Sequence, residues 1–224
     1  MSEQKEIEER KQSKKIYNIK AILLGEVSTG KTCLINNFLG NDYNSNEKAT
    51  LYPSQAFTEL EINNNKLNLS LWDTMGQEKF RSVTKSFIKD SNIVIFVYDI
   101  TRRDTFLELN FWVDTVKREI DKEDVIFGLA ANKIDLINES QVENEEGVEY
   151  AHSIGALFSE TSAEKNIGFS NLVNKLLEQL ILNSNNLKNI ETKREKRGSI
   201  HISPNLYKDN TDNKENKKNN KCTK

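Results

Sequence analysis

The sequence predicts an α/β fold in three layers, with a six-stranded, mostly parallel sheet flanked by five helices. Short apolar runs alternate along the chain with amphipathic segments of helical period, which is the pattern of parallel strands joined by crossover helices. A glycine-rich segment, residues 25–32, joins the first apolar run to the first amphipathic one. Asn63-Asn64-Asn65 form one tight turn, which makes the second and third strands an antiparallel hairpin.

Each element follows from its own pattern. Strands are expected at residues 16–24, 57–62, 66–72, 92–98, 125–131 and 156–160, where apolar side chains are continuous or alternate. Helices are expected at residues 31–39, 80–89, 104–120, 144–154 and 167–182, where apolar side chains recur at helical spacing. The leucines of the last helix share one face and are assigned to the core rather than to a partner; they are Leu172, Leu176, Leu177 and Leu180.

Length and composition fit one folded domain with a tail at each end. The chain has 224 residues, of which 36% are hydrophobic, enough for one core over residues 16–182. Residues 1–15 form a charged N-terminal extension, and residues 183–224 an Asn- and Lys-rich disordered tail. We expect neither a membrane span nor a signal peptide. The two cysteines, Cys33 and Cys222, lie far apart in the sequence and have no matching partners, so they indicate neither a disulfide framework nor a zinc site.

The charge of the tail is opposite to that of the domain. Residues 188–224 carry eleven Lys or Arg against five Asp or Glu, a net of +6, which leaves −8 for residues 1–187 out of the total of −2. Such a tail suits weak contact with an anionic membrane surface. A solvated linker is an equally good interpretation.

Residues 25–32 indicate a nucleoside triphosphate. They read Gly-Glu-Val-Ser-Thr-Gly-Lys-Thr and fit the pattern G-x-x-x-x-G-K-[ST] after an apolar strand. The glycines let backbone N–H groups close around phosphate oxygens. Lys31 adds a point charge, Thr32 offers its hydroxyl to Mg²⁺, and the helix that follows turns its positive end to the phosphates. An ordinary glycine-rich turn is the weaker alternative.

Two further loops select the nucleotide and its metal. Asn132-Lys133-Ile134-Asp135 follows a buried strand, and the Asp135 carboxylate can accept the two adjacent donors of guanine, which adenine lacks. Asn132 can tie this loop to the phosphate loop, and the stem of Lys133 can cover the base. Asp73 is expected in the Mg²⁺ shell; in the same loop Gly76 can contact the terminal phosphate and Gln77 can orient the attacking water.

Several further motifs follow one another along the chain: Leu71-Trp72-Asp73-Thr74, Gly76-Gln77-Glu78-Lys79-Phe80-Arg81-Ser82, Val97-Tyr98-Asp99-Ile100-Thr101 and Glu160-Thr161-Ser162-Ala163. In this order they resemble the motifs of Rab proteins, a branch of the Ras superfamily of small GTPases. The resemblance covers about residues 16–182 and implies a three-layer P-loop NTPase G domain. Residues 86–91 most resemble Rabs that act at the Golgi.

The resemblance implies a monomeric switch that cycles between GDP and GTP with slow hydrolysis and regulates vesicle trafficking. It implies an exchange factor, an activating protein and effectors as partners, no nucleic acid, and a cytoplasmic location with an endomembrane face, Golgi or endosomal. Thr50 lies nineteen residues after Lys31, the family's spacing to its switch threonine, and Tyr43 falls where an aromatic ring meets guanine.

The implied site residues are as follows. Gln77 is catalytic, and Thr32, Thr50 and Asp73 hold the metal. The nucleotide is bound by Gly25, Glu26, Val27, Ser28, Thr29, Gly30, Lys31, Thr32, Cys33, Tyr43, Thr50, Asp73, Gly76, Asn132, Lys133, Asp135, Ser162, Ala163 and Glu164.

Departures from the family pattern bear on turnover and partners. Val27 and Met75 stand where smaller residues are common and add bulk near the γ-phosphate, which disturbs in-line attack. Tyr52-Pro53 alters the effector loop. Glu164 replaces a lysine that covers the base, unless Lys165 substitutes for it. These features leave open an alternative, a GTP-holding interaction protein with little turnover. A third interpretation, an ATP-dependent P-loop kinase, is disfavoured because Asp135 accepts donors that adenine lacks and no phosphoacceptor lid is apparent.

The residues around Cys222 fit neither lipidation pattern of the family. The chain ends Lys221-Cys222-Thr223-Lys224, with a single cysteine third from the end. Such an ending matches neither paired cysteines nor C-a-a-X. The sequence therefore leaves membrane anchoring of a Rab-like kind in doubt, and a single lipid chain would bind only marginally without the basic tail.

Overall fold

A six-stranded sheet forms the centre of the protein. The computed structural model describes residues 16–41, 54–63, 65–74, 87–120 and 125–183. The strand order is β2-β3-β1-β4-β5-β6, and all neighbours are parallel except the antiparallel pair β2 and β3. The expected α/β class with a six-stranded, mostly parallel sheet is confirmed. The strands are β1 (Ile16–Leu24), β2 (Ser54–Ile62), β3 (Asn65–Asp73), β4 (Ile93–Asp99), β5 (Ile126–Asn132) and β6 (Ala156–Thr161).

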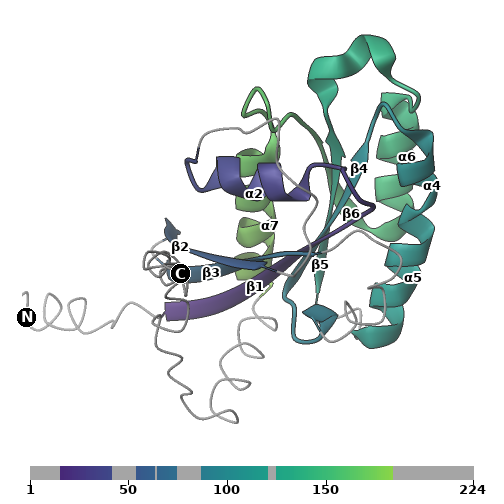
Figure 1. Ribbon diagram of the computed structural model, residues 1–224. Coiled ribbons are helices and arrows are strands. Elements are labelled where there is room, and N and C mark those ends of the chain that lie inside the picture. The colour runs from purple at the N-terminus through teal and green to yellow at the C-terminus, as the bar shows by residue number, and fades with distance from the viewer. Residues whose placement is uncertain (1–15, 42–53, 64, 75–86, 121–124, 184–224) are drawn as a thin grey trace, which may run out of the picture.

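Helices cover both faces of the sheet (Figure 1). The described helices are α2 (Lys31–Phe38), α4 (Arg103–Leu107), α5 (Leu109–Glu119), α6 (Asn144–Ile154) and α7 (Phe169–Leu182), with a 3₁₀ helix, η3 (Ile134–Glu139). Figure 1 shows α2 and α7 on one side of the sheet and α4, α5 and α6 on the other. Three layers result, as the sequence pattern predicts. Among the described residues, no helix combines the length and the apolar character needed to cross a bilayer.

One expected helix differs in detail. The segment expected as a single helix over residues 104–120 is interrupted at Glu108, and α4 and α5 are separate elements. Phe111 N–H donates to Glu108 O at 3.1 Å, a bond three residues back rather than four, so the turn is tightened here. The apolar face continues across the interruption, and for this reason hydrophobic periodicity alone does not reveal it. Most of the helix expected at residues 80–89, and both tails, lie outside the described residues.

Two apolar clusters, one on each face of the sheet, make up the core. β1 contributes to both because its side chains alternate: Ile19 and Leu23 face α2 and α7, whereas Ile22 faces α4 to α6. The four leucines assigned to the core in α7 are each at most 1% exposed, which confirms that assignment. On the opposite face, Trp112 of α5 is fully buried.

The carboxyl ends of the parallel strands bring distant residues together at one edge of the sheet. Asp99 at the end of β4 pairs in register with Asn132 at the end of β5, and Asn132 pairs with Thr161 at the end of β6. β1 ends at Leu24 beside them and leads into the glycine-rich loop. Ligands of open α/β sheets bind at this edge, outside the carboxyl ends of the strands.

Candidate nucleotide-binding site

The loop between β1 and α2 requires glycine at both ends. Gly25 has φ +152°, and a Cβ there would lie 2.1 Å from the backbone oxygen of Val97. Gly30 has φ +92°, and a Cβ there would lie 2.4 Å from Asn132 Nδ2. Larger residues would therefore push the loop away from β4 and β5. The loop is fixed against the ends of two central strands, and α2 begins directly after it at Lys31.

Lys31 places a buried ammonium group inside this loop. Its side chain donates to the backbone oxygens of Gly25 and Glu26, at 2.8 Å each, and the residue is 6% exposed. Burial lowers the pKa of Lys31 to about 8, although the carboxylates of Asp73 and Glu26 act in the opposite direction. A buried cation held mainly by neutral carbonyls is costly without an anion. Phosphate oxygens would supply that anion.

Thr32 and Asp73 bring a hydroxyl and a carboxylate together beside Lys31. The Thr32 hydroxyl donates to Asp73 Oδ2 at 2.6 Å, and Asp73 is 2% exposed at the end of β3. The next residue is anchored as well, because the Thr74 hydroxyl donates to the backbone oxygen of Leu23 at 2.6 Å. Hard oxygen donors of this kind fit Mg²⁺ that is completed by phosphate oxygens and water. Within the described segments, no group of three or more His, Cys, Asp or Glu forms an independent metal site.

Asn132 connects the phosphate loop to the loops at the other end of the site. Its Nδ2 donates to the backbone oxygen of Thr29 at 2.8 Å, which is the tie that the sequence predicts. Its Oδ1 accepts from the Thr161 hydroxyl at 3.1 Å. Both Asn132 and Thr161 are at most 1% exposed. One buried amide therefore fixes three loops relative to one another.

Asp135 is oriented by the loop after β6. The Ser162 hydroxyl donates to Asp135 Oδ1 and accepts from the backbone N–H of Lys165. Ser162 and Ile167 also exchange two backbone hydrogen bonds, at 3.0 and 3.1 Å, which close the loop on itself. This arrangement brings the two segments assigned to the base, residues 132–135 and 160–163, into direct contact.

Lys133 is held by Asp99, which belongs to the Val97-Tyr98-Asp99-Ile100-Thr101 motif. Its ammonium group lies 2.6 Å from Asp99 Oδ2, and Asp99 is fully buried. The other oxygen of Asp99 accepts from the backbone N–H and the hydroxyl of Thr101, at 2.9 and 2.7 Å. Lys133 itself has a left-handed backbone, with φ +70°. Asp99 therefore fixes the far end of the stem that is expected to cover the base.

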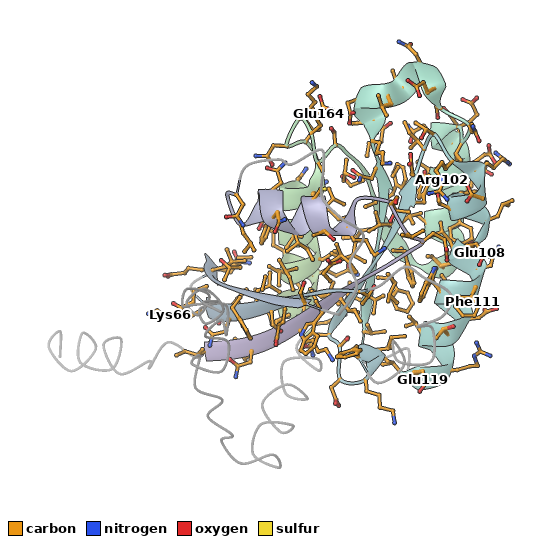
Figure 2. All side chains as sticks on the ribbon, viewed as in Figure 1. Lys66, Arg102, Glu108, Phe111, Glu119 and Glu164 are labelled. Carbon is orange, nitrogen blue, oxygen red and sulfur yellow. The ribbon has the colours of Figure 1, made fainter. Side chains whose placement is uncertain are left out.

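Two more residues hold the phosphate loop from the α4 and α5 side. Arg102 Nη1 donates to the backbone oxygen of Val27 at 3.1 Å, and Figure 2 shows Arg102 beside α4. Trp112 Nε1 donates to Glu26 Oε1 at 3.2 Å. Sequence reasoning missed both contacts because their partners are 75 and 86 residues apart. Side chains from the α4 and α5 side of the sheet thus hold the phosphate loop at Glu26 and Val27.

Glu164 and Lys165 form an exposed pair at the other end of the site. Lys165 Nζ lies 2.7 Å from Glu164 Oε1, and Figure 2 shows Glu164 in the loop near α2. The hydrogen bond that Lys165 donates to this carboxylate raises the pKa of Lys165. Cys33 lies half-buried in α2. The predicted site residues Tyr43, Thr50, Gly76 and Gln77, together with Met75 and Tyr52-Pro53, lie outside the described residues.

Three features define a P-loop nucleotide-binding protein. They are the carboxyl edge of the sheet, the glycine-bounded loop around a buried lysine, and the Asp135 carboxylate held by a second loop. Comparison with known proteins agrees with this class. The Ras family model matches residues 20–182. The chain is 37% identical over 165 residues to Ras-related protein Rab-21 of Canis lupus familiaris, covering 74% of each chain. It is equally identical to human Rab-21, with 74% of this chain and 73% of that protein covered. Mouse Rab-17 is 36% identical, with 74% and 77% covered.

The chain belongs to the Ras superfamily as a Rab-type small GTPase. It is a GTP-binding protein that uses GTP, GDP and Mg²⁺ and hydrolyses GTP, and regulators and effectors act on it as on the family in general. Lys31 and the phosphate loop are suited to the phosphates, and Thr32 with Asp73 would hold the Mg²⁺. The metal supplies charge neutralisation for the phosphoryl group.

Proposed function

We propose that this protein is a switch of the Rab type that regulates vesicle trafficking from the cytoplasmic face of an endomembrane, Golgi or endosomal. The supporting observation is the buried Asn132 side chain, which joins the phosphate loop to both base loops. That connection makes one rigid site out of three segments, so a guanine nucleotide can bridge them. Residues 16–182 act as a monomeric G domain between a charged extension at 1–15 and the basic tail at 183–224.

The proposed residue roles rest on this geometry for the described residues and on the family pattern alone for Tyr43, Thr50, Gly76 and Gln77. Gly25 to Cys33 bind the phosphates, with Lys31 as their charge. Asn132, Lys133, Asp135, Ser162, Ala163 and Glu164 surround the base, and Tyr43 meets its edge. Thr32, Thr50 and Asp73 hold Mg²⁺, Gly76 contacts the γ-phosphate, and Gln77 orients the attacking water.

Hydrolysis in this protein is slow because of Val27. The residue lies in the half of the phosphate loop that also holds the Lys31 ammonium, which is the γ-phosphate end of the cradle. Its backbone oxygen is fixed by Arg102, so the loop cannot shift easily to relieve crowding by the isopropyl group. Displacing the attacking water from in-line geometry by about 1 Å costs on the order of 10²-fold in rate.

Val27→Gly is therefore expected to raise the single-turnover rate of GTP hydrolysis by about tenfold or more. Radiolabelled GTP bound to the purified protein at one equivalent gives the rate without interference from product release. Val27→Ser serves as a control for loop flexibility, since it removes bulk without adding a glycine, and it should also accelerate hydrolysis. Gln77→Leu in the Val27→Gly background should abolish the gain.

The same assay tests the alternative of a GTP-holding interaction protein with little turnover. That alternative is favoured if neither Val27 variant changes the rate and Gln77→Leu leaves the wild-type rate unchanged. In that case the glutamine is not used, and Val27 is not what limits the reaction.

Deleting residues 188–224 is expected to abolish flotation with anionic liposomes and leave nucleotide affinity intact. The tail carries +6 against −8 for residues 1–187, and each basic residue at an anionic surface contributes up to about 1 kcal/mol. The binding should weaken between 50 and 300 mM salt, since screening shortens electrostatic reach to under about 10 Å. Salt-resistant binding of the native protein, with a prenyl group on Cys222 by mass spectrometry, would refute this electrostatic account.

A further inference from the structure

The last turn of α2 contacts the base loop as well as following the phosphate loop. Asn37 Nδ2 donates a hydrogen bond to the backbone oxygen of Ala163, 126 residues further along the chain. A carbonyl oxygen only accepts, so the nitrogen of the Asn37 amide must face it whichever way the amide is drawn. Ala163 is 6% exposed and Asn37 is half-buried, so water competes weakly for this bond.

The segments that flank the two partners of this bond are packed against α7. Phe38, next to Asn37, packs edge-on against Phe169 at the start of α7, with ring centroids 6.0 Å apart. Gly168 just before it has φ +79°, and a Cβ there would lie 1.9 Å from Glu160 O, so the base loop closes tightly on α7. The Asn37 donor therefore sits on a rigid support rather than on a fraying helix end.

The other hydrogen bonds of this loop are made at Ser162 rather than at Ala163. Ser162 is fixed by its bonds with Asp135, Lys165 and Ile167, but none of these bonds involves the Ala163 backbone. Among the described residues, the hydrogen bond that reaches this backbone from outside the loop comes from Asn37. The orientation of the Ala163 N–H and C=O groups thus depends on a side chain that the sequence gives no reason to assign to the site.

We propose that Asn37 is a positioning residue for base recognition: by holding the Ala163 carbonyl, it aims the backbone N–H groups of this loop at the 6-oxygen of guanine. This inference rests on the proposed base-binding role of Ser162 and Ala163. α2 then supports both ends of the nucleotide, with Lys31 and Thr32 at its first turn and Asn37 at its last. Asp135 reads the 2-amino side of the base independently of Asn37.

The experiment measures the affinities of GDP, 6-thio-GDP and IDP for the wild type and for two variants, Asn37→Leu and Asn37→Asp. Both variants lack the donor, and the aspartate keeps the shape of asparagine. 6-Thio-GDP replaces only the 6-oxygen by a poor acceptor, and IDP lacks only the 2-amino group. In both variants the preference for GDP over 6-thio-GDP should be about three- to tenfold smaller than in the wild type, because one hydrogen bond contributes about that much to affinity. The preference for GDP over IDP should stay unchanged.

Two controls make the outcome decisive. Asn36→Asp changes the neighbouring half-buried asparagine and should alter neither preference, and Asn37→Gln keeps an amide donor and should retain part of the GDP over 6-thio-GDP preference. An equal loss of affinity for all three nucleotides, with both ratios unchanged, would show a merely structural role and overturn the proposal. Asp135→Asn, measured alongside, must reduce the GDP over IDP preference; its failure would instead reject the base site itself.

Discussion

Replacing Asp135 with asparagine should shift the preference of this GTPase from guanine to xanthine nucleotides. In the proposed site the carboxylate accepts both N1–H and the 2-amino group of guanine, and Ser162 donates a hydrogen bond to one of its oxygens. Two hydrogen bonds to a charged acceptor contribute roughly 1.5–3 kcal/mol each, so GDP affinity should fall on the order of 10³-fold. An amide keeps an oxygen for Ser162 and turns its nitrogen to the 2-oxygen of xanthine, which restores a complementary contact.

Competition of GDP and XDP against a fluorescent nucleotide measures this change of base preference directly. Glu139→Gln is a matched control, because it removes a carboxylate from the exposed end of the same 3₁₀ helix, η3, and should leave both affinities unchanged. The assignment of the base site fails if Asp135→Asn has no effect on the GDP to XDP ratio. Equal competition by ATP and GTP for the wild type would contradict it as well.

Local sequence patterns suffice for most of the fold because each strand and helix carries its own periodicity. α6 begins and ends where expected, and β1 spans the predicted residues 16–24. The interruption between α4 and α5 was not predictable in this way, since the buried face is continuous through Glu108. The 3₁₀ helix η3 was also missed, because its short turns leave no hydrophobic period of their own.

The site is predictable where a motif names the residue and unpredictable where a distant side chain supports it. Asn132 was expected to reach the phosphate loop, and it does. Asn37, Arg102 and Trp112 were not expected, because each acts on a backbone or side chain at least 75 residues away. Nothing in the local pattern of an amphipathic helix separates such a residue from an ordinary surface position. Asp99 is an intermediate case, because its motif is recognisable in the sequence but the contact of Asp99 with Lys133 is not.

Asn132, Arg102 and Trp112 hold the phosphate loop in place before a nucleotide binds, and this has a consequence for Lys31. The ammonium is buried together with the loop carbonyls, and its lowered pKa means that the folded, nucleotide-free protein disfavours the charged form. Below pH 8 that charge therefore destabilises the free protein relative to the unfolded chain. Nucleotide binding reverses this effect by placing phosphate oxygens at the ammonium.

Lys31→Ala, and the better-packed Lys31→Met, should accordingly lose GTP affinity on the order of 10²-fold or more while the nucleotide-free protein keeps its melting temperature or gains in it. Isothermal titration measures the affinity, and thermal melting with and without GTP shows the loss of ligand stabilisation. Lys175→Met, at an exposed position of α7, is the charge-matched control and should change neither quantity.

Thr32→Asn should weaken nucleotide binding by disturbing Mg²⁺ rather than by removing a phosphate charge. Unchanged GTP affinity in both the Lys31 and Thr32 variants would mean that the nucleotide phosphates lie elsewhere, since no other buried ammonium among the described residues faces this loop.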